Sequence, residues 1–252
     1  MRIEKDTLGE VRVPDDAWYG AQTQRAVENY PISGLREHPA FIRAFILLKK
    51  AAALANHELG AMDERIASAI IGACDKLLDE EDITRHFVVD VFQAGAGTSF
   101  NMNCNEVLAN LANVSLGGAR GDDKPVHPND QVNMSQSTND VVPTAIRIAI
   151  LFLLDLLYPQ LEALADVLDE KGAQFADVIK SGRTHLQDAV PITLGQEFRA
   201  YAAAVRRSTR LLRNVSEEVE ELGIGGTAVG TGINTPLGYR FAVLRHLNAS
   251  TG

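Results

Sequence analysis

The sequence predicts a mainly α protein, in which a mostly helical N-terminal domain with short strands precedes part of a long-helix bundle. Three observations predict this class. Apolar residues recur at helical spacing over most of the chain, proline and glycine bound these stretches, and two stretches continue for about 30 residues. We place the N-terminal domain at residues 1–136 and the first part of the bundle domain at residues 137–252.

The first half of the chain predicts an irregular start followed by three helices. The stretch "GEVRVP" alternates apolar and polar residues among several prolines and glycines, which is typical of short strands. Helices are then expected over residues 39–60, 63–80 and 101–118. Pro39 opens the first of these helices and Gly60 closes it, in agreement with the usual positions of the two residues.

The second half predicts long helices over residues 139–171 and 193–223 and a shorter one over 236–250. Residues 146–157 are apolar nearly all round, and such a helix must be covered on every side. The other two helices are too few to cover it. We therefore expect the chain to associate with copies of itself, to be part of a longer protein, or both. Charged residues interrupt the apolar run before it reaches the ~20 residues of a membrane span, so we expect a buried helix and no membrane.

Composition and charge exclude several classes of function. The net charge of -9 argues against nucleic acid as a partner, because nucleic acid requires clustered Lys and Arg. Two cysteines, Cys74 and Cys104, are too few for a disulfide framework, and the N-terminus has no apolar signal region, which indicates a reducing cytoplasmic setting. The six histidines are scattered and no phosphate-binding glycine motif is present, so we expect neither a metal nor a cofactor.

Four polar clusters interrupt the helical pattern, each where a loop meets the start of a helix. They occupy residues 95–103, 124–130, 135–140 and 182–197. The cluster "SQSTND" has helix capping as its simplest interpretation, because Ser, Thr, Asn and Asp accept from the free N–H groups of a first turn. Several such helix starts at one point would also bind a small dianion. His185 and His127 are the histidines within these clusters.

Long strings in these clusters resemble the fumarase/aspartase superfamily. They are "GAGTSFNMNCNEVLANLA", "HPNDQVNMSQSTNDVVPTA", "SGRTHLQDAVPITLGQEF" and "GGTAVGTGINTP", in this order, together with the opening "RIEKDTLGEVRVPDDAWYGAQTQRAVENYPISG". The resemblance covers essentially the whole chain. It implies a homotetramer whose long helices form a central bundle and whose active sites are each built by three subunits, with a small dicarboxylate as substrate.

The resemblance also implies roles for single residues. Those that match positions binding the carboxylates or the leaving group are Thr98, Ser137, Thr138, Asn139 and Thr184. His185 matches the catalytic-site histidine, and His127, Asn129 and Asp130 match a secondary dicarboxylate site near the entrance. The catalytic serine of the family belongs to a loop of pattern G-S-S-x-M-P-x-K-x-N, which is expected beyond residue 252. This chain is therefore expected to hold the substrate-binding half of a site.

The implied reaction needs many neutral donors. A proton leaves the carbon beside a carboxylate, negative charge builds on the carboxylate oxygens, and ammonia or water is then expelled from the neighbouring carbon. Preorganised hydroxyl, amide and helix-start donors stabilise that charge, and the loss of one costs about 2.7 to 4 kcal/mol.

Two branches of the family remain open from the motifs, together with a non-catalytic derivative. Ala96 and Ser99 in "GAGTS" favour an aspartase, as do "DAVPI", "GQEF" and "NTPLGYR". By contrast, "KPVHPND" and "GGTAVGTG" favour a fumarase. Some residues also have a structural interpretation: Arg183 and Gln187 are as much structural as catalytic candidates, and Asp188 orients the turn before a proline.

Overall fold

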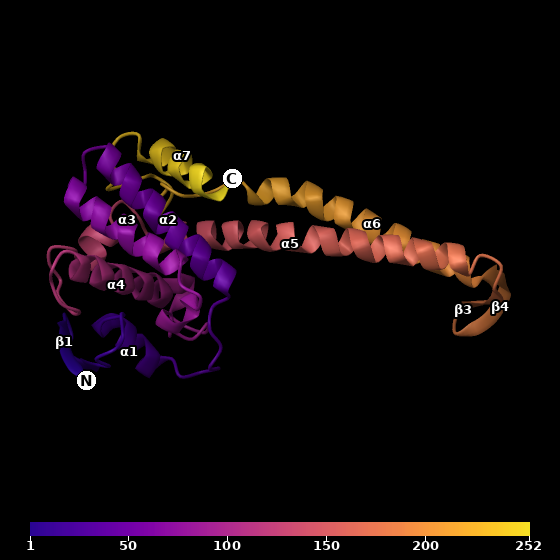
Figure 1. The fold of residues 1–252 in the computed structure, drawn as a ribbon, viewed down its shortest axis with the longest axis horizontal. Helices are drawn as coiled ribbons and strands as arrows, with labels where there is room; N and C mark the ends of the chain where they lie inside the picture. Colours follow the sequence, from indigo (N-terminus) through magenta and orange to yellow (C-terminus); the bar gives the residue numbers. More distant parts are fainter. The chain divides into compact units, whose positions relative to one another are not determined.

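The computed structural model describes residues 1–252 and confirms the mainly α class (Figure 1). The helices are α1 (Ala21–Asn29), α2 (Pro39–Glu58), α3 (Glu64–Leu78), α4 (Thr98–Ser115), α5 (Thr138–Gln174), α6 (Leu194–Val219) and α7 (Tyr239–Thr251), with the single turns η1 (Ile83–His86), η2 (Gly95–Gly97) and η3 (Pro128–Val132). Two antiparallel hairpins pair β1 (Arg2–Asp6) with β2 (Gly9–Val13), and β3 (Ile179–Thr184) with β4 (Gln187–Thr193). Each predicted helix is found close to its predicted bounds.

The chain divides into two compact units. Unit 1 comprises Met1–Ala149 and Leu222–Gly252, and unit 2 comprises Ile150–Glu221. Helix α5 therefore begins in unit 1 and ends in unit 2. The domain boundary that we predict between residues 136 and 137 is a different kind of boundary from that between the compact units, and it stays a prediction. By packing, the first turns of α5 belong with the N-terminal residues.

Helix α4 is the centre of unit 1. Every residue from Ser99 to Asn113 is buried, and α1, α3 and η3 all contact the helix. Helix α2 packs against α3 and α7. At one end of this core the rings of Phe41, Phe45 and Phe87 lie around Phe100, with centroids 5.0 to 5.5 Å from its ring. Aromatic burial of this kind holds the start of α4 in a fixed position.

Helix α1 corrects the prediction of an irregular segment over the first forty residues. Its N-cap residue Gly20 offers no side chain, and the cap comes from Glu106 in α4 instead. The Glu106 carboxylate accepts hydrogen bonds from the backbone N–H groups of Gly20, Gln22 and Thr23 at 2.9 to 3.0 Å. An anion at a helix start stabilises the helix. Because this anion lies 83 to 86 residues away along the chain, no local pattern indicates it.

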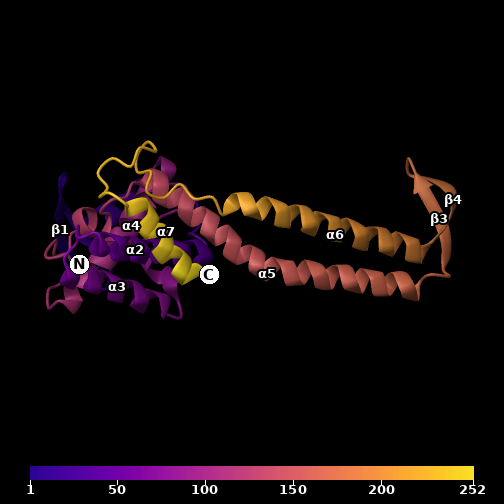
Figure 2. The same cartoon turned by 90° about the horizontal axis from the view of Figure 1, so that it is seen from above.

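Unit 2 contains the later part of α5, the β3–β4 hairpin and α6, which runs antiparallel to α5 (Figure 2). At the hairpin end the two backbones approach closely, since a Cβ atom on Gly195 would lie 2.4 Å from the Gly172 carbonyl oxygen. Ion pairs of Arg206 with Asp166 and Asp169 and of Arg213 with Glu162 join the helices. These ion pairs are exposed, so their contribution to stability is small.

Helix α5 is longer than the apolar stretch that we expected to be too short for a membrane. It has 37 residues, and its most apolar window of 18 residues has a mean hydropathy of 2.0. By length and composition alone it would be able to cross a membrane, so the length argument was wrong. Only 39% of that window is buried, and the exposed residues include Leu153, Leu156 and Leu157. The absence of a membrane partner stays a prediction.

Candidate functional site

The polar cluster before α5 caps the helix. Ser137 precedes the first helical residue, and its hydroxyl accepts from the Asn139 backbone N–H at 3.3 Å. In return, the Asp140 carboxylate accepts from the Ser137 backbone N–H at 2.9 Å. This pair resembles a capping box, except that the Ser137 hydroxyl accepts from the second helical residue while the aspartate is the third. The capping interpretation of "SQSTND" is therefore confirmed.

The same helix start anchors the glycine-rich loop of residues 222–238. The second carboxylate oxygen of Asp140, which is buried, accepts from the backbone N–H groups of Gly225 at 3.1 Å and Thr227 at 2.9 Å. The Asn139 side chain donates to the Ala228 carbonyl oxygen at 2.8 Å. Asp140 thus fixes the position of the glycine-rich loop. The amide nitrogen of Asn139 is bound to this loop, whereas the amide oxygen of Asn139 takes no part in that bond.

Thr98 is the first residue of α4 and lies beside the start of α5. The turn before it has positive φ at Ala96 (62°) and Gly97 (78°). A Cβ atom on Gly97 would lie 3.0 Å from a methyl carbon of Val142, so glycine permits the close approach of this turn to α5. The Thr98 side chain is exposed, while Ser99 is buried. The structure therefore packs the start of α4, which begins at Thr98, against the start of α5, and a shared site of Thr98 with Ser137, Thr138 and Asn139 stays a prediction.

Sequence reasoning missed the residues that connect these elements. Asn101 in α4 donates to the Thr138 hydroxyl at 3.3 Å and to the Asn133 side-chain oxygen at 3.2 Å. Lys49 in α2 donates to the side-chain oxygens of both asparagines, at 2.8 and 2.9 Å. The sequence signal for this network was Lys49 itself, a charged residue within a mainly apolar helical stretch, and the sequence motifs predict no role for it.

Thr184 and His185 belong to unit 2, at the tip of the β3–β4 hairpin. Thr184 pairs with Gln187, which leaves His185 and Leu186 as a two-residue turn with φ of 48° and 62°. Two positive φ values are those of a type I′ turn, which normally contains Asn or Gly. Both residues are exposed, Leu186 fully. Left-handed backbone conformations at residues other than glycine are common at functional sites, so the backbone geometry of the hairpin tip keeps it a candidate part of the site.

The hairpin also places the neighbours of His185. Arg183 pairs with Asp188 in the strand register, directly beside the pair of Thr184 and Gln187. All four residues are exposed. The expected role of Asp188 in orienting a turn before the proline was wrong, because Asp188 and Pro191 both lie within β4 and no turn separates them.

The three residues of the expected secondary site lie together in unit 1. His127 caps η3, and its Nδ1 atom accepts from the backbone N–H groups of Asn129 at 3.2 Å and Asp130 at 3.3 Å. Since Nδ1 is the acceptor, the neutral imidazole carries its proton on Nε2. His127 and Asn129 line a pocket of about 920 Å³ that also includes Lys5 and Arg25. The lining also contains the carboxylates of Glu4, Asp6, Glu106 and Asp123, and Arg25 is paired with Asp6, so this pocket does not favour an anion by charge. Asp130 lies outside its lining.

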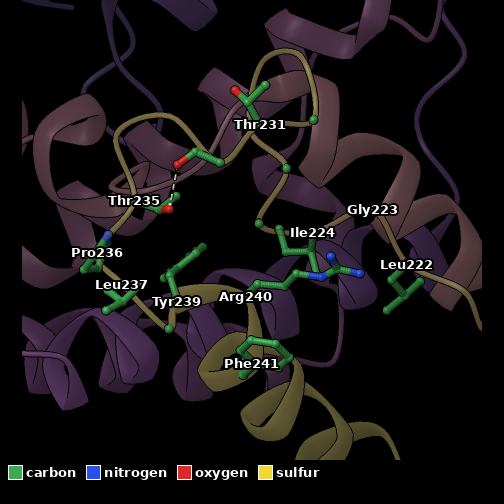
Figure 3. A pocket seen from close by; sticks show the side chains of 15 residues that line it. Leu222, Gly223, Ile224, Thr231, Thr235, Pro236, Leu237, Tyr239, Arg240 and Phe241 are labelled. Carbon is green, nitrogen blue, oxygen red and sulfur yellow. Dashed lines mark hydrogen bonds between the residues drawn. The ribbon is translucent and has the colours of Figure 1, made fainter.

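A second pocket, of about 540 Å³, lies within the glycine-rich loop and the start of α7 (Figure 3). Backbone lines much of it, and Arg240 is its only charged side chain. Thr235 fixes the loop by donating from its hydroxyl to the Gly232 carbonyl oxygen at 2.7 Å. No residue that we expected in the site lines this pocket. It is connected to the site only through the loop that Asn139 and Asp140 anchor.

The structure contains no group of three His, Cys, Asp or Glu residues arranged to hold a metal ion. Both cysteines are free and buried. Burial raises the pKa of the Cys104 thiol to about 12, so this side chain is a neutral core residue, as its position in α4 indicates.

Comparison with known proteins gives a family and several relatives. The model of a family described as "Lyase" matches residues 9–252. Aspartate ammonia-lyase from Corynebacterium glutamicum is 49% identical, with 100% of this chain and 48% of the relative aligned. Fumarate hydratase class II from Halobacterium salinarum is 50% identical over 100% of this chain and 53% of its own length. The chain thus spans about half the length of the curated relatives it matches.

Solved structures agree with this assignment. The fumarate lyase:delta crystallin from Brucella melitensis bound to cobalt has a TM-score of 0.94 and 50% identity, over 100% of this chain and 55% of that one. The recombinant class II fumarase from Schistosoma mansoni has a TM-score of 0.91 and 36% identity, over 99% and 53%. The fold is therefore shared with these proteins over the whole of the chain.

Proposed function

Because this chain belongs to the lyase family, within the fumarase/aspartase superfamily, we propose that the whole protein forms fumarate by elimination from L-aspartate, as an aspartate ammonia-lyase. The observation that carries the proposal is the cluster at the start of α5. There Ser137, Thr138 and Asn139 offer hydroxyl and amide groups at a helix N-terminus, and the start of α4 packs against it through Asn101 and Gly97.

This cluster suits the charge that the reaction develops. A base removes a proton from the carbon beside one carboxylate, the electron pair moves onto that carboxylate, and it then returns to form the double bond as ammonia leaves the neighbouring carbon. The cluster offers neutral donors at the positive end of a long helix, which favour carboxylate oxygens without adding a competing base. The Asn139 amide oxygen is an acceptor that an ammonium group requires.

Ala96 and Ser99 favour L-aspartate over L-malate as the substrate. Ala96 has a positive φ in the turn before Thr98, and Ser99 is buried as the second residue of α4, so the two residues flank Thr98 on either side. A fumarate hydratase is the second candidate, because "GGTAVGTG" and "KPVHPND" favour it and a hydratase relative is 50% identical. A mismatched buried polar group discriminates between substrates by about 10⁴-fold, so one enzyme is not expected to serve both equally.

We also propose a homotetramer in which residues from different copies form each active site. The exposure of Thr184 and His185 supports this, since both side chains need partners to act on substrate. Exposed apolar residues of α5, with Leu156 at 69% exposure, support association through that helix. Two free cysteines and a negative net charge support a cytoplasmic setting without nucleic acid.

The direct test is a fumarate absorbance assay on the protein encoded by the complete reading frame. We expect absorbance to rise with L-aspartate and to rise at least about 100-fold more slowly with L-malate. Rapid dehydration of L-malate with no activity on L-aspartate would assign the protein to the hydratases. Inactivity on both substrates would contradict a fumarate-forming enzyme.

A further inference from the structure

The ammonium group of Lys49 is completely buried in unit 1, beneath the start of α5. Its side chain has 0% exposure, and its hydrogen bonds go to the side-chain oxygens of Asn101 and Asn133, at 2.8 and 2.9 Å. No carboxylate accepts a hydrogen bond from it. A buried charge normally has an ionic partner, because desolvation without one is costly. Lys49 is therefore a buried positive charge with no carboxylate in hydrogen-bonding contact, and the Asp140 carboxylate acts on it only at longer range.

The next residue provides a contrast. Lys50 is half-buried and forms an ion pair with Asp75 at 2.5 Å, between α2 and α3. Two adjacent lysines on one helix thus differ in their environment. Lys50 has the carboxylate partner that is expected of a structural cation, and Lys49 faces two neutral amides.

Lys49 sets the direction of a chain of hydrogen bonds that ends at the candidate site. An ammonium group only donates, so it requires the oxygen of Asn101 to point toward it. The Asn101 amide nitrogen then points away and donates to the Thr138 hydroxyl oxygen at 3.3 Å. Because that oxygen is occupied as an acceptor, the hydroxyl proton of Thr138 is available for an anion outside the chain.

We propose that Lys49 is a positioning residue of the dicarboxylate site, which holds Thr138 as a hydrogen-bond donor and supplies the buried positive charge that a substrate carboxylate neutralises. This inference rests on the proposed function, since it assumes that Thr138 binds a carboxylate. It adds a charge to a site whose other members are neutral, and it identifies a residue that never contacts the substrate.

The titration of Lys49 supports this role. Burial lowers its pKa to about 8, against the opposing influence of the Asp140 carboxylate in α5. The nearby thiols of Cys104 in α4 and Cys74 in α3 are neutral at this pH, because burial raises their pKa values. A bound dicarboxylate favours the charged form and raises this pKa. Above about pH 8 the free protein loses the charge, and a neutral amine no longer fixes the direction of the Asn101 amide. Affinity for a dicarboxylate is therefore expected to fall as the pH rises from 7 to 9.5.

The test measures succinate binding calorimetrically on the complete protein between pH 6.5 and 9.5. Succinate has no amino group, so its own charge is constant over this range. We expect Lys49→Met to weaken binding by about 10- to 100-fold at pH 7 and to abolish the alkaline decrease. Lys49→Arg, which keeps the charge, should recover part of the affinity. Lys50→Met is the matched control and should bind within about twofold of wild type.

A second variant keeps the test decisive where Lys49→Met folds poorly. Asn101→Asp has the same shape, gives Lys49 an internal counterion and removes the donor to Thr138. We expect it to keep the fold, by thermal unfolding, and to weaken succinate binding at least tenfold. Wild-type affinity and pH dependence in Lys49→Met or Asn101→Asp would overturn the role of Lys49 alone. Absence of succinate binding by the wild-type protein would overturn the dicarboxylate site itself, and this inference with it.

Discussion

The candidate site residues of units 1 and 2 differ in burial and in hydrogen bonding. In unit 1 the side chains near the start of α5 are tied into one network, in which Asp140 alone accepts three backbone N–H groups. In unit 2 the candidate residues Thr184 and His185 stand at an exposed hairpin tip, and the ion pairs between α5 and α6 are exposed as well. We therefore predict that unit 1 holds a preformed part of the site, and that the exposed residues of unit 2 act on substrate only after they contact another copy.

The largest expected effect is on catalysis from the unit 2 tip. We expect His185→Ala or Thr184→Val to lower kcat/KM about 30- to 1000-fold, which corresponds to about 2 to 4 kcal/mol of lost transition-state stabilisation. Both side chains are exposed, so the midpoint of thermal unfolding should be unchanged. Steady-state kinetics with each variant provides the measurement, and Val190→Ser on the same hairpin is the control. Unchanged kinetics in either variant would remove that residue from the site.

The next effect concerns stability and contrasts a buried carboxylate with an exposed one. Asp140→Ala leaves three backbone N–H groups without an acceptor, and we expect a loss of about 3 kcal/mol in the free energy of unfolding. Asp166→Ala breaks an exposed ion pair with Arg206 in unit 2 and should cost less than about 1 kcal/mol. Urea unfolding of the two variants measures both. Equal losses of unfolding free energy in the two variants would contradict the difference between the buried carboxylate of unit 1 and the exposed one of unit 2.

Alkaline pH should remove the free-energy cost of burying the charged Lys49 side chain in unit 1. Because the pKa of Lys49 is about 8 in the folded chain and has the ordinary value of 10.5 after unfolding, the unfolded chain binds one more proton between these values. The free energy of unfolding should therefore rise with pH over this window, by up to about 3 kcal/mol from this group. The group destabilises the fold fully below pH 8 and ceases to do so above pH 10.5. Urea unfolding at pH 7.5 and 10 should show this rise in wild type relative to Lys49→Met, because the buried Cys74 and Cys104, whose pKa values are raised, contribute the same opposing fall to both proteins.

The smallest effect lies in the turn of the unit 2 hairpin. Leu186 has a left-handed backbone that disfavours leucine and that asparagine tolerates. We expect Leu186→Asn to raise the free energy of unfolding by about 0.5 kcal/mol. Val190→Asn, in the adjoining strand, is the control and should not stabilise. A loss of stability in Leu186→Asn would mean that the leucine has a contact partner in the assembled protein.

Helices could be predicted from the sequence where local pattern determines them. Helix α6 follows its amphipathic period from a capping box at Thr193 and Gln196, and α2 begins at Pro39. Helix α1 was missed because its cap is Glu106, far along the chain. The β3–β4 hairpin was missed because its turn contains His185 and Leu186 instead of the residues that normally indicate such a turn.

The candidate site was predicted in part for a similar reason. The polar cluster of Ser137, Thr138 and Asn139 stands out because capping residues precede a helix, whereas the site roles of these residues and of Thr98 were predicted from the resemblance of their motifs to the fumarase/aspartase superfamily. The roles of Lys49, Asn101 and Asn133 depend on three elements meeting in space. In the sequence, nothing distinguishes Lys49 from Lys50. Only packing separates the one with a carboxylate partner from the one without.

The measurement that tests the central claim most directly is complementation between the two units. We propose that one active site uses Thr138 from unit 1 of one copy and His185 from unit 2 of another. Thr138→Val and His185→Ala proteins, each nearly inactive, would be dissociated, mixed and reassembled, with subunit exchange verified by mass tags. The account predicts fumarate formation from L-aspartate well above the sum of the two variants measured separately. Activity that stays at that sum after verified exchange would contradict it.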